Sequence, residues 1–297
     1  MSKPPTLTLP REARAYRLAT ARGDFAVHDA GEPRSGTALL VPGFTGSKED
    51  FIALLAPLAR QGFRVVAVDG RGQHETGGPR RESAYAQDEL ALDVLAQAEA
   101  LDGDVHLVGH SLGGLIARAA VLRDPAPFAS LTIMSSGPAA ISPAQQARTR
   151  MLLDALAAMD MEEVWQAMRD LDPPEAADAA TPPAIGEFLR RRWLANVPEQ
   201  LVATGRQLLT EPDRVAELAA VPLPKHVLSG AVDYAWPVPL MDEMARRLRA
   251  RRTVIEGAEH SPGAERPRET ADALAAFWHA CRAVGPEPSR SITRFPG

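Results

Sequence analysis

The sequence predicts an α/β fold in which a doubly wound, mostly parallel sheet carries a helical insertion. Three observations lead to this prediction. Short apolar runs without alternation recur along the chain, as in parallel strands that are covered on both faces. Helical patterns alternate with these runs. One interval of about 85 residues, from Gly137 to Val221, contains only helical patterns and is too long for a simple crossover.

The composition of the chain is that of a globular protein with a large core. Among 297 residues, 45% are apolar and 24% are charged, which is ordinary for globular proteins. The formal net charge of −5 argues against a nucleic-acid partner. No apolar segment approaches the ~20 residues of a membrane span, and no signal peptide is visible. The single cysteine, Cys281, excludes an internal disulfide, so we expect a cytoplasmic protein.

The predicted strands and helices follow one another in the order of this fold. Residues 13–30 alternate apolar and polar side chains around Gly23 and Asp24, as the two strands of an edge hairpin do. Further strands are predicted at 37–41, 64–68, 105–108, 131–134, 225–228 and 252–255. Apolar residues at helical spacing predict helices at 48–61, at 84–100 and from 112 onward.

This order divides the chain into a core and an insertion. We expect an α/β core made of residues 13–136 and 222–284. We expect residues 137–221 to form a helical cap over the carboxyl ends of the strands. The two ends of the chain, residues 1–12 and 285–297, are expected to be loose.

One strand–turn–helix segment carries the clearest chemical signal. The apolar strand at 105–108 runs into Gly109-His110-Ser111-Leu112-Gly113, and a helical pattern follows. This is the G-x-S-x-G nucleophile elbow in its expected context. A strand that turns directly into a helix strains its corner residue and crowds the positions two before and two after it. Glycine at 109 and 113 relieves the crowding and leaves the Ser111 hydroxyl at the positive end of the helix.

The order of the motifs resembles that of the α/β-hydrolase superfamily, in particular its capped serine esterases and lipases. The motifs are Pro42-Gly43-Phe44 after one strand, Asp69-Gly70-Arg71-Gly72 after the next, the elbow around Ser111, the helical insertion, Asp233 and His260. The resemblance extends from about residue 25 to residue 282. It implies an α/β-hydrolase fold and a serine nucleophile.

The resemblance also implies the partners of Ser111. His260 lies in the loop after the last strand, where this family carries its base, and His74 is a secondary candidate. Asp233 lies in the loop after the preceding strand and matches the acid that fixes the tautomer of the base. Alternatively, Asp233 only forms a turn with Gly230 and takes no part in catalysis. The order Ser111, Asp233, His260 is the order that this fold uses.

The same resemblance assigns the oxyanion hole to the backbone N–H groups of Phe44 and Leu112. Pro42 stands where relatives often have a histidine, and a side chain that often supports this loop is therefore lost. The donors are backbone groups, so the hole itself is retained. The glycine-rich turn that begins at Asp69 is expected to brace the loop.

The remaining expectations concern the pocket and its contents. We expect a substrate pocket lined by Phe44, His110, Trp165, Trp193 and Trp236. The methionines of the insertion could line it or pack the core of the insertion itself; they are Met151, Met159, Met161 and Met168. No His, Cys, Asp and Glu cluster has metal-ligand spacing, and no G-x-G-x-x-G follows a strand. We therefore expect no metal and no cofactor.

These features favour a hydrolase that cleaves small carboxylic esters of short-to-medium acyl chains through an acyl-enzyme intermediate. Carbon–carbon hydrolases, thioesterases and aminopeptidases of this fold use the same triad and remain alternatives. A receptor-like module that binds a small molecule with little turnover is another. Related dehalogenases and epoxide hydrolases use a carboxylate nucleophile and are disfavoured by Ser111. The sequence specifies neither the natural substrate nor an oligomeric state.

Overall fold

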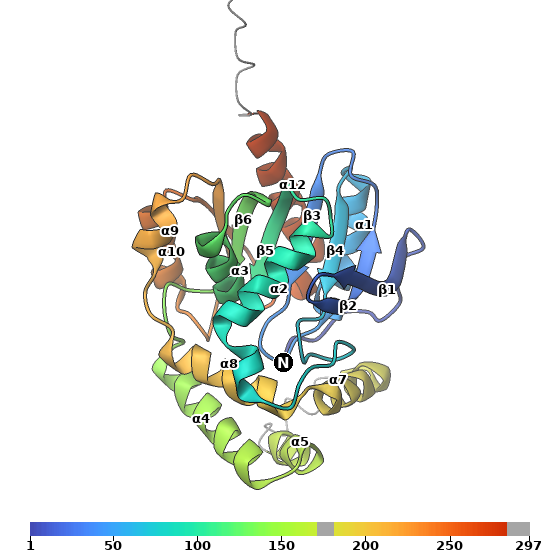
Figure 1. The fold of residues 1–297 in the computed structure, drawn as a ribbon, viewed down its shortest axis with the longest axis vertical. Coiled ribbons are helices and arrows are strands. Elements are labelled where there is room, and N and C mark those ends of the chain that lie inside the picture. The colour runs from blue at the N-terminus through green and yellow to red at the C-terminus, as the bar shows by residue number, and fades with distance from the viewer. Residues whose placement is uncertain (171–180, 284–297) are drawn as a thin grey trace, which may run out of the picture.

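An eight-stranded sheet forms the centre of the part of the chain that this computed structural model describes, residues 1–170 and 181–283 (Figure 1). The strands are β1 (Ala13–Thr20), β2 (Gly23–Ala30), β3 (Thr37–Val41), β4 (Arg64–Val68), β5 (Val105–His110), β6 (Phe128–Met134), β7 (Lys225–Gly230) and β8 (Arg251–Ile255). Their order in the sheet is β1-β2-β4-β3-β5-β6-β7-β8. The hairpin β1–β2 pairs antiparallel with β4, and all later neighbours are parallel. The predicted fold class is confirmed.

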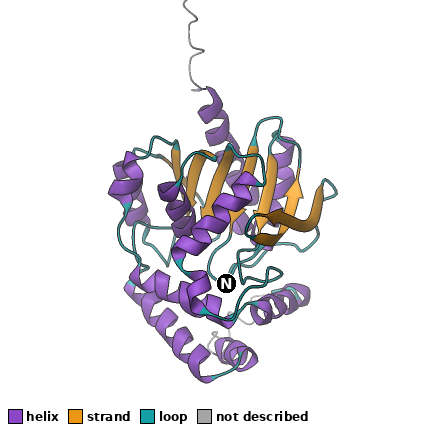
Figure 2. Cartoon of the chain, in the orientation of Figure 1, coloured by secondary structure: helices purple, strands orange, loops and turns teal. Residues whose placement is uncertain are grey.

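Helices cover both faces of the sheet, as Figure 2 shows. One face packs against the 3-10 helix η1 (Lys48–Phe51) and the helices α1 (Ile52–Arg60), α11 (Pro262–Glu265) and α12 (Pro267–Ala283). The other packs against α2 (Gln87–Glu99), which follows the 3-10 helix η2 (Glu82–Tyr85), and against α3 (Leu112–Arg123), α9 (Val215–Ala220) and α10 (Val238–Leu248). Two separate apolar cores result, one on each face, which explains why the strands are apolar on both sides.

The insertion between β6 and β7 is helical throughout its described residues. Its helices are α4 (Pro143–Ala158), α5 (Met161–Asp170), α7 (Pro183–Ala195), α8 (Pro198–Thr210) and α9. The first four lie together beyond one end of the sheet (Figure 1) and share a third apolar cluster. The fifth, α9, packs instead against α3 and α10 of the core. Residues 171–180, which include Pro173 and Pro174, lie outside the described residues.

The N-terminal segment, residues 1–12, which we expected to be loose, contacts both the core and the insertion. Pro4 is buried, Leu9 packs against the core, and Leu7 packs against the apolar cluster of the insertion. The Ser2 carbonyl accepts a hydrogen bond of 2.8 Å from Arg192 of α7. Leu7 and Leu9 thus supply apolar contacts of this Pro-rich segment, and Ser2 supplies a polar one. The other expected loose end, residues 285–297, lies outside the described residues.

Among the described helices, none has the length and hydrophobicity needed to cross a bilayer.

Candidate active site

Ser111 occupies a strained corner between β5 and α3. Its backbone has φ 55° and ψ −120°, a conformation that costs a non-glycine residue energy and recurs at functional sites. The two glycines of the elbow are needed for space. A Cβ on Gly109 would lie 2.2 Å from the carbonyl oxygen of Gly113, and one on Gly113 would lie 2.4 Å from that of Val41. The close backbone approach therefore holds Ser111 in its strained conformation.

Ser111, His260 and Asp233 form one hydrogen-bonded chain. The Oγ of Ser111 is 3.0 Å from Nε2 of His260, and Nδ1 of His260 is 2.9 Å from Oδ2 of Asp233. The other oxygen of Asp233 accepts the backbone N–H groups of Ala235 and Trp236, at 2.8 and 3.1 Å. Because a carboxylate only accepts, the Nδ1 of His260 carries the proton and Nε2 faces the hydroxyl as an acceptor. This is the arrangement of a serine nucleophile, a base and an orienting acid.

The other histidines do not reach Ser111, and all seven lie in the described part of the chain. His74, the secondary candidate, packs edge-on against Phe188 of α7 with 5.5 Å between ring centroids, and it does not line the cavity at Ser111. His110 is buried, and its Nε2 donates to the His260 carbonyl at 2.7 Å. Burial lowers the pKa of His110 to about 4, so this ring is neutral and fixes the loop that carries His260.

The loop of residues 42–47, between β3 and η1, passes directly beside Ser111. A Cβ on Gly43 would lie 3.1 Å from the Cβ of Ser111. Within the described residues, the Phe44 N–H donates to no protein group. Leu112 is the first residue of α3, and the first N–H groups of a helix have no partner inside it. Leu112 follows Ser111 directly, and Phe44 follows Gly43, whose backbone lies beside Ser111. Both N–H groups that the resemblance implies therefore lie near this corner and are available to a ligand.

Gln73 braces the 42–47 loop, and the sequence analysis missed it. Its Nε2 donates to the carbonyl oxygens of Gly43 at 2.7 Å and of Phe44 at 3.2 Å. Its Oε1 accepts the N–H of Gly70, which fixes the orientation of the amide. In a trans peptide the C=O and the N–H point in opposite directions. By holding the Gly43 carbonyl, Gln73 therefore orients the Phe44 N–H. The sequence signal was the position of Gln73 in the turn expected to brace this loop.

We expect Gln73→Met, which keeps the side-chain length but removes the donor, to lower kcat about fivefold to tenfold. A hydrogen bond contributes about 1 kcal/mol net, and about 1.4 kcal/mol corresponds to tenfold in rate. KM should stay within twofold, because the loop orients a group needed in the transition state. The control is Gln97→Met on α2, which also removes a buried amide. A similar loss in both variants, or a loss in KM alone, would contradict this role.

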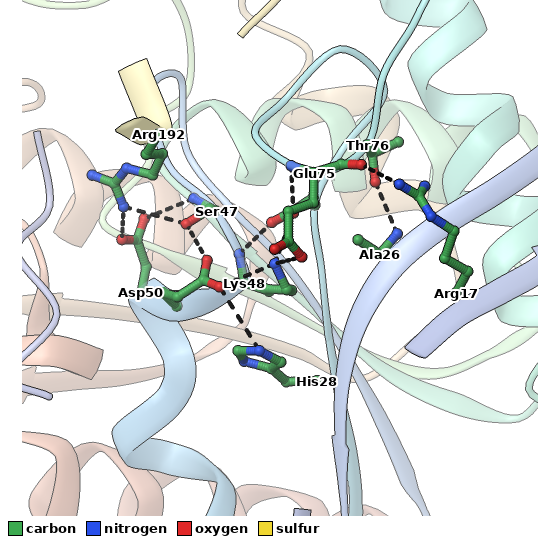
Figure 3. A network of polar contacts seen from close by, with 11 residues as sticks. Arg17, Ala26, His28, Ser47, Lys48, Asp50, Glu75, Thr76 and Arg192 are labelled. Carbon is green, nitrogen blue, oxygen red and sulfur yellow. Dashed lines mark hydrogen bonds and ion pairs between the residues drawn. The ribbon is translucent and has the colours of Figure 1, made fainter. Parts of the chain in front are cut away.

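A buried ion-pair network anchors the end of the 42–47 loop (Figure 3). The backbone N–H of Lys48 donates to Asp69 at 2.8 Å, and its Nζ lies 3.0 Å from the other oxygen of Asp69. The same Nζ contacts Glu49 at 3.0 Å and Glu75 at 2.7 Å. Burial opposes the charge on Lys48, but Asp69 and Glu49 outweigh it and raise the pKa of the ammonium group. The turn that begins at Asp69 therefore braces the loop, as expected.

A second buried ion pair joins the insertion to the core. Arg192 of α7 is fully buried, and its Nη1 lies 2.7 Å from Oδ1 of Asp50 in η1 (Figure 3). The other oxygen of Asp50 accepts the N–H of Ser47 at 3.3 Å. Burial raises the pKa of Asp50, against the opposing effect of Arg192. One side chain thus connects α7, the 42–47 loop and, through the Ser2 carbonyl, the N-terminal segment.

We expect Arg192→Met to lower the free energy of unfolding by about 3–5 kcal/mol, because it leaves the buried Asp50 carboxylate unpaired. Urea unfolding followed by circular dichroism measures the change. The neighbouring Arg191 is exposed and pairs with Glu187 on the same helix, so Arg191→Met should cost under about 0.5 kcal/mol. Adding Asp50→Asn to Arg192→Met should restore part of the loss. Equal effects of the two arginine variants would show that the buried pair has no special role.

A cavity of about 740 Å³ opens at Ser111 and extends under the insertion. Of the predicted pocket residues, Phe44, His110 and Trp193 line it, as do Met151 and Met168. Met159 and Met161 instead pack against the apolar cluster of the insertion. Side chains of α4 and α5 contribute to the apolar wall of the cavity.

Two of the residues predicted to line the pocket, Trp165 and Trp236, do not line the cavity. Trp165 is buried in the cluster of α5, α7 and α8, and its neighbour Val164 lines the cavity instead. Trp236 is fully buried, donates its Nε1 to the Ala139 carbonyl at 2.8 Å, and packs over Gly137. Both indoles therefore hold the insertion in place and do not line the cavity.

The described residues contain no group of three or more His, Cys, Asp or Glu side chains that could hold a metal ion. The charged clusters that do occur near Ser111 are ion pairs between carboxylates and Lys48 or Arg192.

Comparisons with known proteins find relatives of this chain by sequence and by structure. The sequence profile of the alpha/beta hydrolase family matches residues 38–273. A pimeloyl-[acyl-carrier protein] methyl ester esterase of Edwardsiella ictaluri is 30% identical over 255 residues, 80% of this chain and 92% of that protein. Its counterpart in Aeromonas hydrophila is 29% identical over 75% of this chain and 88% of that protein.

Other relatives align over a shorter stretch or by structure. RutD of Variovorax paradoxus is 35% identical over 106 residues, so the chain spans only 40% of that protein's length. Among solved structures, a hydrolase from Pseudomonas aeruginosa superposes with a TM-score of 0.73 at 25% identity, covering 89% of this chain and 98% of that one. An esterase from Thermogutta terrifontis superposes with a TM-score of 0.72 at 24% identity, over 91% and 99%.

Proposed function

The chain belongs to the alpha/beta hydrolase family, and from this premise we propose that it is a serine hydrolase that cleaves carboxylic esters through an acyl-enzyme intermediate. The observation that carries the proposal is the chain of hydrogen bonds from Ser111 through His260 to Asp233, at 3.0 and 2.9 Å. Ser111 is the nucleophile, His260 the base and Asp233 the acid. Residues 137–221 act as the cap of the substrate cavity.

The reaction follows from the proton positions. The Ser111 Oγ attacks the ester carbonyl while its proton passes to Nε2 of His260. The N–H groups of Phe44 and Leu112 stabilise the oxyanion that forms. As the tetrahedral intermediate collapses, His260 returns the proton to the leaving alkoxide, and the acyl group stays on Ser111. Water then attacks the acyl-enzyme with His260 as base again, which releases the carboxylic acid and restores the serine.

The size and lining of the cavity support acyl chains of short to medium length. A volume of about 740 Å³ falls in the range of small-molecule pockets. Val164, Met168 and Trp193 form an apolar end under the cap, and methionine adapts to varied apolar ligands. The relatives named as methyl ester esterases support ester cleavage over the other reactions of the same triad.

The test of this proposal is kcat/KM for 4-nitrophenyl esters from acetate to palmitate. Each buried methylene should improve kcat/KM about fourfold, since it contributes about 0.8 kcal/mol, until the cavity is full. A maximum at palmitate would make the protein a lipase for long chains. Turnover of a vinylogous diketone or an aminoacyl anilide, with every ester inert, would overturn the proposal in favour of a carbon–carbon hydrolase or an aminopeptidase.

We expect Asp233→Asn to lower kcat about 10³–10⁴-fold, because the amide can donate to Nδ1 of His260 and so favours the wrong tautomer. Steady-state kinetics on the best ester measure the loss. Glu259→Gln is the matched control, since Glu259 is exposed and precedes His260 directly. If Asp233→Asn loses less than tenfold in kcat and Glu259→Gln loses more, Glu259 is the acid that partners His260.

A further inference from the structure

Besides its histidines, the cavity is lined by two formally charged side chains of the described residues, Asp50 and Arg148. Asp50 is paired with Arg192 at 2.7 Å and is neutralised by it. Arg148, on α4, has no ion-pair or hydrogen-bond partner in the part of the chain that the structure describes. Among the described side chains that line the cavity, Arg148 therefore carries the one uncompensated positive charge, and this side chain is exposed.

The wall formed by α4 is polar at one end and apolar at the other. Gln145, Arg148 and Thr149 line the cavity near the N-terminal end of the helix, and Leu152 and Ala155 line it further along. This spacing places all five on one face of the helix. The apolar end meets the apolar side chains of α5, so the cavity has a polar side and an apolar side.

The polar end of α4 lies next to the loop that carries Asp233. Ser142, which precedes α4, donates its N–H to the Ala235 carbonyl at 2.8 Å and its hydroxyl to the Tyr234 carbonyl at 2.9 Å. The ring of Tyr234 lines the cavity 4.8 Å from the ring of His260. Burial raises the pKa of Tyr234 to about 12, and the nearby charge of Arg148 acts in the opposite direction. Arg148 therefore lies on the His260 side of the cavity.

His260 protonates the leaving alkoxide, so the alcohol half of the ester leaves on this same side. Asp233 on that side is paired with His260. The other two carboxylates whose charge acts on Tyr234, Glu259 and Glu265, do not line the cavity. Glu265 is also occupied, because it accepts the backbone N–H groups of Glu259 and Ser261. Neither carboxylate is placed to neutralise Arg148.

We propose that Arg148 binds an anionic group, a carboxylate or a phosphate, carried by the alcohol half of the ester, while the apolar acyl chain lies under the cap. The proposal rests on the ester hydrolase function proposed above. A guanidinium group binds both anions through two parallel hydrogen bonds. At the rim of a partly enclosed cavity such a pair is screened less than on an open surface.

The experiment compares two substrates that differ only in charge on the alcohol half, 4-butyryloxybenzoate and 4-butyryloxybenzamide. We expect Arg148→Gln to lower kcat/KM at least tenfold for the anionic benzoate and less than twofold for the neutral benzamide. The loss should lie in KM, and 0.5 M NaCl should reduce the difference between the substrates in the parent enzyme. Arg148→Glu should widen the loss for the benzoate further.

Arg150→Gln is the matched control on the same helix. Arg150 is exposed, donates to Gln146 at 2.9 Å, and does not line the cavity. It should leave both substrates within twofold. An equal loss for benzoate and benzamide in Arg148→Gln, or the same selective loss in Arg150→Gln, would overturn the proposal.

A third substrate, 4-nitrophenyl hemiglutarate, carries its carboxylate on the acyl half. A loss confined to the hemiglutarate would place the anion on the acyl half and overturn the assignment to the alcohol half. Inactivity of the parent enzyme on every ester, the neutral benzamide included, would instead refute the ester hydrolase function. The two failures are therefore distinguishable.

Discussion

Replacing Ser111 by alanine should lower kcat by about 10⁴-fold or more, because no group remains to form the acyl-enzyme. The parent enzyme should react covalently with a fluorophosphonate at this residue, and Ser111→Ala should not be labelled at all. Intact mass spectrometry measures the labelling, and peptide mapping identifies the modified residue. Substrate KM should change little, since the serine hydroxyl contributes mainly to the transition state.

Ser261→Ala is the control for this experiment. Ser261 lines the same cavity and follows His260 directly, so it tests whether a serine next to the base could be modified in place of Ser111. We expect Ser261→Ala to be labelled at the parent rate. Retention of activity in Ser111→Ala, or labelling at another serine, would remove Ser111 from the role of nucleophile.

The fold could be predicted from the sequence because its signals are local. Valine and leucine runs identify the strands, and the steric demand for glycine at 109 and 113 identifies the corner at Ser111. The Asp233 and His260 positions came from a resemblance in motif order, and the structure brings both within hydrogen-bond distance of each other. Each of these features depends on a few neighbouring residues.

The environment of the cavity could not be predicted in the same way, because it depends on contacts between distant elements. Val164 and Trp165 are adjacent apolar residues of α5, and only the rotation of that helix decides which one lines the cavity. Residues 1–12 lack periodicity, yet Ser2 meets Arg192 across 190 positions of sequence. Gln73 braces a loop that lies 29 residues earlier. Pairings over such distances leave no local pattern.

The sequence around Arg192 does contain a pattern that indicates a buried arginine, but the neighbouring arginines make it hard to recognise. Arg192 belongs to a run of three arginines, which by itself indicates a solvated surface. However, the buried residues of α7 are Ile185, Phe188, Leu189, Arg192 and Trp193. These positions follow the helical spacing of an apolar face, so an arginine on that face must have a buried partner. Asp50 is that partner.

We expect His260→Ala to lose at least about 10⁴-fold in kcat/KM, while His74→Ala keeps more than a tenth of the activity. Without His260 the hydroxyl has no base, and removing the base alone from such a unit costs about as much as removing the whole triad. His74 packs on Phe188 and does not line the cavity, so its loss should cost under ~1.4 kcal/mol in transition-state stabilisation.

Two readouts separate a missing base from a damaged fold in His260→Ala. Added imidazole should restore part of the activity in a concentration-dependent way, because it fits the space that the side chain vacates between Ser111 and Asp233. The melting temperature should stay close to that of the parent. Inactivity of His74→Ala with a fully active His260→Ala would assign the base to His74, against the 3.0 Å contact between His260 and Ser111.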